Sequence, residues 1–336
     1  MTIIAWKNLA DTILCKSLQQ NNNLRRTTHL LRGICKSYYS WYKNSPVLSK
    51  AHLSYWSEDE TLTLSSTRTL SDGYKIPRFG LGLYDLDEKH TKQAVLWALE
   101  NGYRMIDTAA SYNNEKRVGE ALRESAVPRS EVYLVTKVYH TDHGYEKTMK
   151  AYDRSLSALG VDYVDLYLIH FPVPAGVVGS WEAMAELQGK GLTRSIGVSN
   201  FNIHHLEALQ KHSVIPPVVN QIEVHPYLQM EELVDFCRKH SIAIQAYSPL
   251  TRGEKLHDPL LRSLGDKYGK TPAQVLLRWS LQKGYICISK SVQLSRIIEN
   301  VDVFNFTISM ADMEILDGLE ENLRTGRHKI LWPWEG

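Results

Sequence analysis

Short apolar runs alternate with longer amphipathic runs from about residue 69 to the C-terminal part of the chain. The apolar runs are rich in Val, Ile, Leu and Tyr, and polar residues bound them, which is typical of buried strands. We predict eight strands, at Phe79–Leu83, Arg104–Asp107, Val132–Lys137, Val164–His170, Arg194–Ser199, Val218–Glu223, Ala243–Tyr247 and Ile286–Lys290. The amphipathic runs predict helices at about 88–101, 114–125, 146–159, 180–190, 204–211, 231–240, 259–268, 272–283 and 293–299.

This alternation predicts parallel strands joined by helical crossovers. Eight repeats over about 230 residues fit a (β/α)8 TIM barrel. The competing α/β fold, an open doubly wound sheet, usually has a glycine-rich fingerprint after its first strand. Here that place holds Gly80-Leu81-Gly82-Leu83-Tyr84, without the third glycine, so the barrel is favoured. Ahead of the barrel, the turn Ser71-Asp72-Gly73-Tyr74 predicts a β-hairpin between Thr67–Leu70 and Lys75–Pro77.

Residues 1–65 differ from the rest of the chain in composition. The basic residues there include Lys7, Lys16, Arg25, Arg26, Arg32, Lys36, Lys43 and Lys50. Asp11 is the only acidic residue before Glu58. Basic, acid-poor N-termini can be organelle transit peptides; the alternatives are a poorly ordered tail and a mis-assigned translation start. We therefore divide the chain into an extension, 1–65, and a barrel domain, 66–336.

The overall composition is that of an ordinary globular protein, with 43% hydrophobic and 23% charged residues among 336. A net charge of +2 gives no global electrostatic reason to bind nucleic acid or membranes. No apolar run approaches the roughly 20 residues of a membrane helix. The cysteines, Cys15, Cys35, Cys237 and Cys287, lack metal-ligand spacing and are expected to be reduced packing thiols. The expected location is the cytoplasm, or the mitochondrion if residues 1–65 are a transit peptide.

Ionisable groups stand at three consecutive predicted strand ends, where barrel enzymes place their catalytic residues. Asp107 ends the second strand with Tyr112 just beyond, Lys137 ends the third, and His170 ends the fourth. Each has an ordinary alternative: a helix cap for Asp107, a surface phenol for Tyr112, a solvated lysine, and a core histidine. Their convergence on one mouth of the barrel favours a catalytic set.

A tyrosine with a pKa near 10 transfers protons poorly at neutral pH. We expect Lys137, held by Asp107, to lower the pKa of Tyr112 and make it a general acid, while His170 donates a second hydrogen bond to the substrate oxygen. The set contains no nucleophile–base pair and no clustered zinc ligands. It suits hydride addition to a carbonyl, with the hydride supplied by a cofactor.

The later strand ends predict where that cofactor would bind. Ser199, Asn200 and Gln221 are candidates to hold a carboxamide, and Tyr247 to stack on a flat ring, with Ser248 and Leu250 following it. Lys290, Ser291 and Arg296 stand beside a predicted helix start, a place that favours phosphate. Glu299 and Asn300 lie farther along that helix. The alternatives are an ordinary Arg296–Glu299 ion pair and a core aromatic at Tyr247.

These segments resemble the aldo-keto reductase family over about residues 67–336. The matching segments are Gly102 to Gly119, Gly197-Val198-Ser199-Asn200-Phe201, Lys290-Ser291-Val292 through Asn300, Leu168 to Pro172, and Ala246 to Leu250. The resemblance implies a barrel closed at its bottom by the hairpin and binding a nicotinamide cofactor in an extended pose. It implies Tyr112 as proton donor, tuned by Lys137 and Asp107, with His170 orienting the substrate. It also implies that Lys290, Ser291 and Arg296 face a 2′-phosphate, hence NADPH.

The chain departs from the family pattern at Ser289, usually a proline, and at Tyr84 and Phe171, where the family often has Trp. Tyr84 and Phe171 would reshape the substrate pocket. The C-terminal segment with Trp332 resembles the family loop that helps form this pocket; the alternative is that its tryptophans pack the tail down. The function expected is NADPH-dependent reduction of a small aldehyde or ketone by a monomer. The alternatives are a non-enzymatic NADPH-binding sensor or subunit and a metal-dependent barrel hydrolase.

Overall fold

The computed structural model describes residues 62–173 and 175–326. The predicted extension therefore lies almost wholly outside the described residues, and so does the predicted C-terminal loop with Trp332. Leu62 and Leu64 already pack against the hydrophobic core. The packed chain thus includes residues slightly ahead of the predicted boundary at 66.

Eight parallel strands close into a barrel in which the last strand pairs with the first. Their bounds are β3 (Phe79–Gly82), β4 (Met105–Asp107), β5 (Tyr133–Val138), β6 (Val164–Ile169), β7 (Thr193–Ser199), β8 (Val219–Glu223), β9 (Ala243–Tyr247) and β10 (Ile286–Ser289). Every predicted strand is present, with each end within one residue of the prediction. The (β/α)8 fold class is confirmed.

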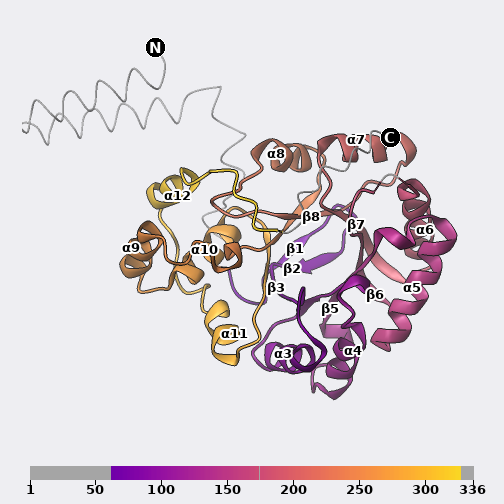
Figure 1. The fold of residues 1–336 in the computed structure, drawn as a ribbon, viewed down its shortest axis with the longest axis horizontal. Coiled ribbons are helices and arrows are strands. Elements are labelled where there is room, and N and C mark those ends of the chain that lie inside the picture. Colours follow the sequence, from indigo (N-terminus) through magenta and orange to yellow (C-terminus); the bar gives the residue numbers. More distant parts are fainter. Residues whose placement is uncertain (1–61, 174, 327–336) are drawn as a thin grey trace, which may run out of the picture. The chain divides into compact units, whose positions relative to one another are not determined.

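Helices surround the barrel on its outer side (Figure 1). They are α3 (Glu88–Glu100), α4 (Glu115–Glu124), α5 (Tyr145–Leu159), α6 (Val177–Gly189), α7 (Ile203–His212), α8 (Glu231–Lys239), α9 (Pro259–Tyr268), α10 (Pro272–Gln282), α11 (Leu294–Val301) and α12 (Met310–Asp317). The prediction missed α12, although Ser309 caps it by accepting a hydrogen bond from the Asp312 N–H at 3.3 Å. None of these helices is long and apolar enough to cross a membrane.

The predicted hairpin, β1 (Thr67–Thr69) and β2 (Lys75–Pro77), closes the N-terminal end of the barrel. Its strands are antiparallel, with Thr67 opposite Pro77. Leu70 and Ile76 pack into the barrel interior with Met105 and other strand residues. The Ser195 hydroxyl donates to Asp72 at 2.7 Å and ties the turn to β7. Since the hairpin covers this end, the opposite end, where the strands finish, is left for the site.

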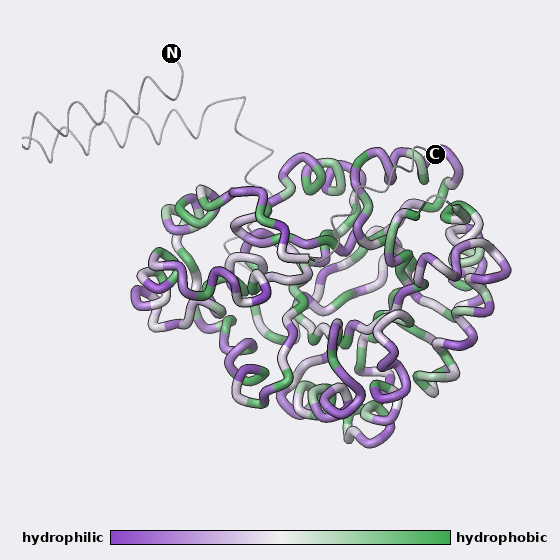
Figure 2. The backbone as a smooth tube through the Cα atoms, viewed as in Figure 1, coloured by the Kyte–Doolittle hydropathy of each residue, from purple (hydrophilic) through white to green (hydrophobic). Residues whose placement is uncertain are grey.

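Apolar side chains form two packed layers. The inner cluster fills the barrel, and the larger outer cluster lies between the strands and the helices. Figure 2 shows hydrophobic and hydrophilic stretches alternating along the outer helices, as expected where one face packs on the barrel. Cys237 and Cys287 are buried and unbonded, and burial raises their pKa values to about 11 and about 12. The expected packing role is confirmed for these two; Cys15 and Cys35 lie outside the described residues.

Candidate active site

A buried ion pair lies at the base of the site, where β4 and β5 end. The Lys137 ammonium donates to the Asp107 carboxylate at 2.6 Å and to the Thr108 carbonyl at 2.8 Å. The Gln221 amide donates to the other Asp107 oxygen at 2.7 Å. Burial raises the pKa of Asp107 and lowers the pKa of Lys137, and the ion pair opposes both shifts. Asp107 and Lys137 therefore form one unit, as predicted.

Tyr112 stands above this pair, at the end of a short 3-10 helix, Ala110–Tyr112. The Lys137 ammonium lies 5.0 Å from the centre of its ring. The rings of Tyr84 and His170 meet it edge-on, at centroid distances of 5.2 and 5.5 Å. Tyr112, Lys137 and His170, which the sequence assigned to proton transfer and substrate orientation, are thus close together.

The expected lowering of the Tyr112 pKa is wrong for this structure. Burial, followed by the nearby Asp107 carboxylate, raises the pKa of Tyr112 well above its ordinary value. The prediction treated Asp107 as a support for Lys137 and left out the effect of its negative charge on the phenol itself. The phenol is therefore held in its protonated form at neutral pH.

His170 follows β6 and faces Tyr112, which follows β4. Its Nδ1 lies 3.3 Å from the Ser111 hydroxyl, and its ring stacks on Phe171 at a centroid distance of 4.3 Å. Its backbone carbonyl accepts a hydrogen bond from the Asn200 amide at 3.0 Å. The ring is thus held between two neighbours, in an orientation toward Tyr112.

Asn200 and Gln221 use their amide N–H groups within the protein. Asn200 donates to the His170 carbonyl and to the Ser199 hydroxyl, and its oxygen accepts from the Tyr247 hydroxyl at 2.8 Å. Gln221 donates to Asp107 and, at 2.9 Å, to Gln245. What both amides can still offer is acceptor capacity on oxygen, which suits the NH2 group of a carboxamide.

The positive residues predicted to bind phosphate lie at the end of β10 and on α11. The Lys290 ammonium donates to the Asp85 backbone carbonyl at 3.0 Å. The Arg296 side chain is exposed, and the predicted alternative of an Arg296–Glu299 ion pair is wrong for the described residues, where the two side chains form no ion pair within 4.0 Å. Glu299 instead accepts a hydrogen bond from the Thr271 hydroxyl at 2.6 Å. Arg296 has no carboxylate partner among the described residues.

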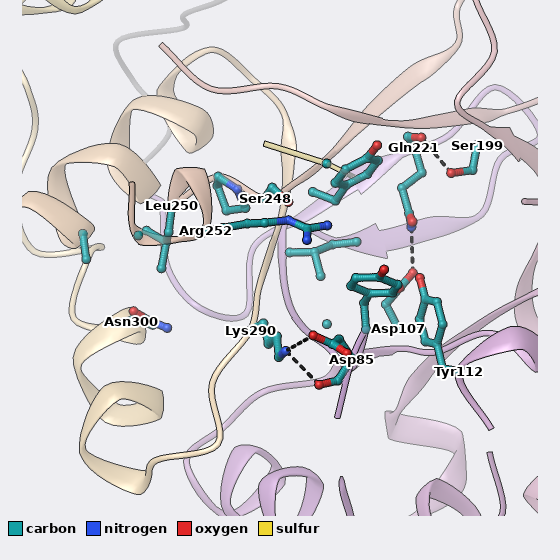
Figure 3. Close-up of a pocket in the computed structure, with 18 of the residues that line it drawn as sticks. Asp85, Asp107, Tyr112, Ser199, Gln221, Ser248, Leu250, Arg252, Lys290 and Asn300 are labelled. Carbon is teal, nitrogen blue, oxygen red and sulfur yellow. Dashed lines mark hydrogen bonds and ion pairs between the residues drawn. The ribbon is translucent and has the colours of Figure 1, made fainter. Parts of the chain in front are cut away.

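A cavity of about 600 Å³ extends from Tyr112 and His170 to Lys290 and Arg296. Figure 3 shows its labelled side chains, with the Gln221–Asp107 contact beside Tyr112 and the Lys290–Asp85 contact beyond. Among the predicted site residues, those that line it are Tyr84, Asp107, Tyr112, His170, Phe171, Ser199, Asn200, Gln221, Tyr247, Ser248, Leu250, Lys290, Arg296, Glu299 and Asn300. Lys137 lies behind Asp107, and Ser291 instead bonds its neighbour Gln293.

Several residues that line the cavity were not among the predicted site residues. Asp85, Arg252 and Gly326 also line the cavity. Arg252 lies 5.3 Å from the Tyr84 ring centre and has a left-handed backbone, φ 50°, which is strained for this residue type. No sequence signal marks it, although Gly253 marks the turn that carries it.

A carboxylate at the end of β8, Glu223, fixes the C-terminal segment to the rim of this cavity. It accepts hydrogen bonds from the Thr325 N–H at 2.8 Å and the Gly326 N–H at 3.1 Å. His225 lies 3.4 Å away. The strand-end rule that found Asp107 could have found Glu223 as well, but its partners lie about a hundred residues later in the chain.

The site shows no metal centre in residues 62–173 and 175–326, since no three His, Cys, Asp or Glu side chains there are placed to hold one ion. The hydrolase hypothesis therefore has no ligand set in this part of the chain. The cavity instead combines a protonated phenol, carboxamide acceptors and a row of cations, Arg252, Lys290 and Arg296. These groups are chemically suited to hold phosphate groups and a carboxamide.

Comparison with known proteins gives one consistent result. The model of the aldo/keto reductase family matches residues 78–321. The chain is 48% identical over 265 residues to an aldo-keto reductase of Mycolicibacterium smegmatis, covering 78% of this chain and 96% of that one. It is 44% identical to a glyoxal reductase of Bacillus subtilis, covering 79% and 96%. A solved Bombyx mori aldo-keto reductase in complex with NADP is 37% identical, with a TM-score of 0.74 over 79% of this chain and 95% of that one.

Proposed function

The chain belongs to the aldo/keto reductase family, and from this premise we propose that it reduces aldehydes or ketones to alcohols with NADPH, with Tyr112 as the proton donor. The observation that carries the proposal is the grouping of Tyr112, His170 and the Lys137–Asp107 pair at one end of a single cavity. Family membership supports an oxidoreductase that acts on carbonyl groups; the cofactor and the role of each residue are our proposal.

When bound, the nicotinamide supplies the hydride to the carbonyl carbon. As that carbon gains the hydride, the π electrons move to the oxygen, which takes the proton of the Tyr112 phenol. The phenol carries this proton at neutral pH, since burial raises its pKa further above neutrality. His170 positions the same oxygen by a hydrogen bond. The buried Asp107–Lys137 pair lies against the Tyr112 ring and holds the phenol in position.

The cofactor assignment rests on matched chemistry along the cavity. The remaining acceptor capacity of the Asn200 and Gln221 oxygens suits the carboxamide, and we assign Tyr247, which lines the cavity, to stack on its ring. Lys290 and Arg296 at the far end favour NADPH over NADH, because only NADPH carries the additional 2′-phosphate. Ser291 does not line the cavity and its hydroxyl bonds Gln293, so its contact with the cofactor stays a prediction. The cytoplasmic location and the monomeric state stay predictions.

The test is the Tyr112→Phe variant, which keeps the ring contacts with Tyr84 and His170 and removes only the hydroxyl. We expect the rate of NADPH-dependent glyoxal reduction to fall by roughly 10²–10⁴-fold, while NADPH affinity is unchanged. Tyr74→Phe is the matched control, because Tyr74 is an exposed tyrosine of the hairpin turn at the other end of the barrel. Near-normal turnover by Tyr112→Phe would refute the proposed role.

Measurements of NADPH binding and of turnover by the wild-type chain also test the alternative, a non-enzymatic NADPH-binding protein. That alternative predicts saturable NADPH binding without turnover of glyoxal, other aldehydes or ketones by the wild-type chain. It gives no reason for a protonated phenol over a buried ion pair, since a binder needs no proton donor.

A further inference from the structure

Two residues of opposite charge that line the cavity, Lys290 and Asp85, lie against each other. The Lys290 ammonium lies 3.0 Å from the Asp85 backbone oxygen and 4.0 Å from its carboxylate. Both residues line the cavity, and Figure 3 shows them facing each other. Lys290 is one of the cations that the proposed function assigns to the cofactor.

The fold brings Asp85 to this place. Asp85 follows β3 and Lys290 follows β10, and these two strands pair where the barrel closes, with Leu81 opposite Ser289. Asp85 has a left-handed backbone, φ 59°, which Asp tolerates better than most residues. The contact therefore joins two loops that leave adjacent strand ends.

The other carboxylates of the cavity are committed elsewhere. Asp107 is bound to Lys137 and Gln221, and Glu299 accepts from Thr271. By contrast, the carboxylate of Asp85 has Lys290 as its charged neighbour within 4.0 Å in the described chain. Asp85 is thus the acidic group of the cavity whose carboxylate lies nearest to Lys290.

We propose that the carboxylate of Asp85 competes with the phosphates of the cofactor for Lys290, so that it weakens cofactor binding and speeds cofactor release. The inference rests on the proposed function, since it requires NADPH to bind in this cavity. A carboxylate and a phosphate seek the same ammonium, and their like charges repel. Arg252 and Arg296 add positive charge to the cavity, so the phosphates still bind in the presence of the Asp85 carboxylate.

The size of the effect follows from the exposure of the pair. Lys290 and Asp85 side chains are 43% and 60% exposed. Solvent-exposed pairs contribute little, so we expect a change in NADPH affinity of about two- to fivefold rather than orders of magnitude. Most of that change should be in the dissociation rate.

The test is Asp85→Asn, which removes the charge and keeps a residue that tolerates a left-handed backbone. NADPH should bind about two- to fivefold more tightly and leave more slowly, as followed by tryptophan fluorescence and stopped-flow displacement. The matched control is Glu88→Gln, an equal charge change three positions away, on α3, where Glu88 pairs with Arg117 outside the cavity. An unchanged or weaker affinity in Asp85→Asn, or an equal gain in Glu88→Gln, would overturn the proposal.

Two further experiments test whether the effect of Asp85 acts through Lys290 and which phosphate group of the cofactor competes with it. In a Lys290→Met background the gain from Asp85→Asn should disappear; a gain that persists there overturns competition through Lys290. NADH lacks the 2′-phosphate, so a gain for NADPH alone supports competition with that group, and an equal gain for NADH supports competition with the diphosphate. If the wild-type chain binds no NADPH at all, the proposed function fails, which is a separate result from an unaltered Asp85→Asn affinity.

Discussion

Replacing Asp107 by Asn would leave the Lys137 ammonium buried without its counter-charge. Lys137 is fully buried and its remaining partner is the Thr108 carbonyl at 2.8 Å. Removing one member of a buried pair costs about 3–5 kcal/mol in the free energy of unfolding. An Asn side chain still offers one oxygen, so we expect the lower end, about 3 kcal/mol. For a domain of this size that corresponds to a fall of roughly 6–12 °C in the thermal midpoint.

Two variants separate this structural cost from catalysis. In Asp107→Leu/Lys137→Met both charges are absent, so most of the lost stability should return, because apolar replacement of a buried pair is often close to neutral. Carbonyl reduction should stay low in the double variant, since the polar pair that lies against the Tyr112 ring is absent. The assays are thermal unfolding by circular dichroism and NADPH oxidation with glyoxal. A single variant as stable as the wild type, or an active double variant, would refute this reasoning.

Three more outcomes follow from particular contacts. Lys290→Met should weaken NADPH binding by about tenfold while NADH binding changes little, as measured by fluorescence titration. Burial disfavours the charge on Glu223, but hydrogen bonds from His225, Thr325 and Gly326 outweigh it and lower its pKa from 4.5 to about 2. Its stabilisation is therefore present above pH 4.5 and lost as the pH falls toward 2, and Glu223→Gln should flatten that dependence in unfolding measurements. Gly119→Ala would place a Cβ 2.1 Å from the Leu159 carbonyl and should cost about 1–3 kcal/mol in unfolding, whereas Gly189→Ala, with open space at its Cβ, should not.

The strands were predictable because each is a local pattern, an apolar run that ends on a polar group. In a parallel barrel the carboxyl ends of the strands meet at one end, and from this rule we predicted that Asp107, Tyr112 and His170 lie together. All three line the same cavity. The rule could not show that Lys137 lies behind Asp107 rather than in the cavity. That difference depends on which way a buried side chain turns, and residue spacing carries no such information.

Contacts between distant loops were out of reach for the same reason. Lys290 meets Asp85, and Glu223 meets Thr325, only because the barrel closes and the chain returns across its rim. Arg252 enters the cavity on a strained turn that its own sequence does not require. The missed α12 is different, since its Ser309 cap is a local signal that is present in the sequence.

The error about the Tyr112 pKa bears on how the proposed site works. A lysine lowers the pKa of a neighbouring phenol only in so far as its charge is not already balanced. Here Lys137 is bonded to Asp107 at 2.6 Å, and the same carboxylate is the leading charge that disfavours a tyrosinate. The pair thus behaves toward Tyr112 as a fixed dipole more than as a cation. A raised pKa makes the phenol a weaker acid, so its proton can move only when the substrate oxygen gains an electron pair and becomes the stronger base.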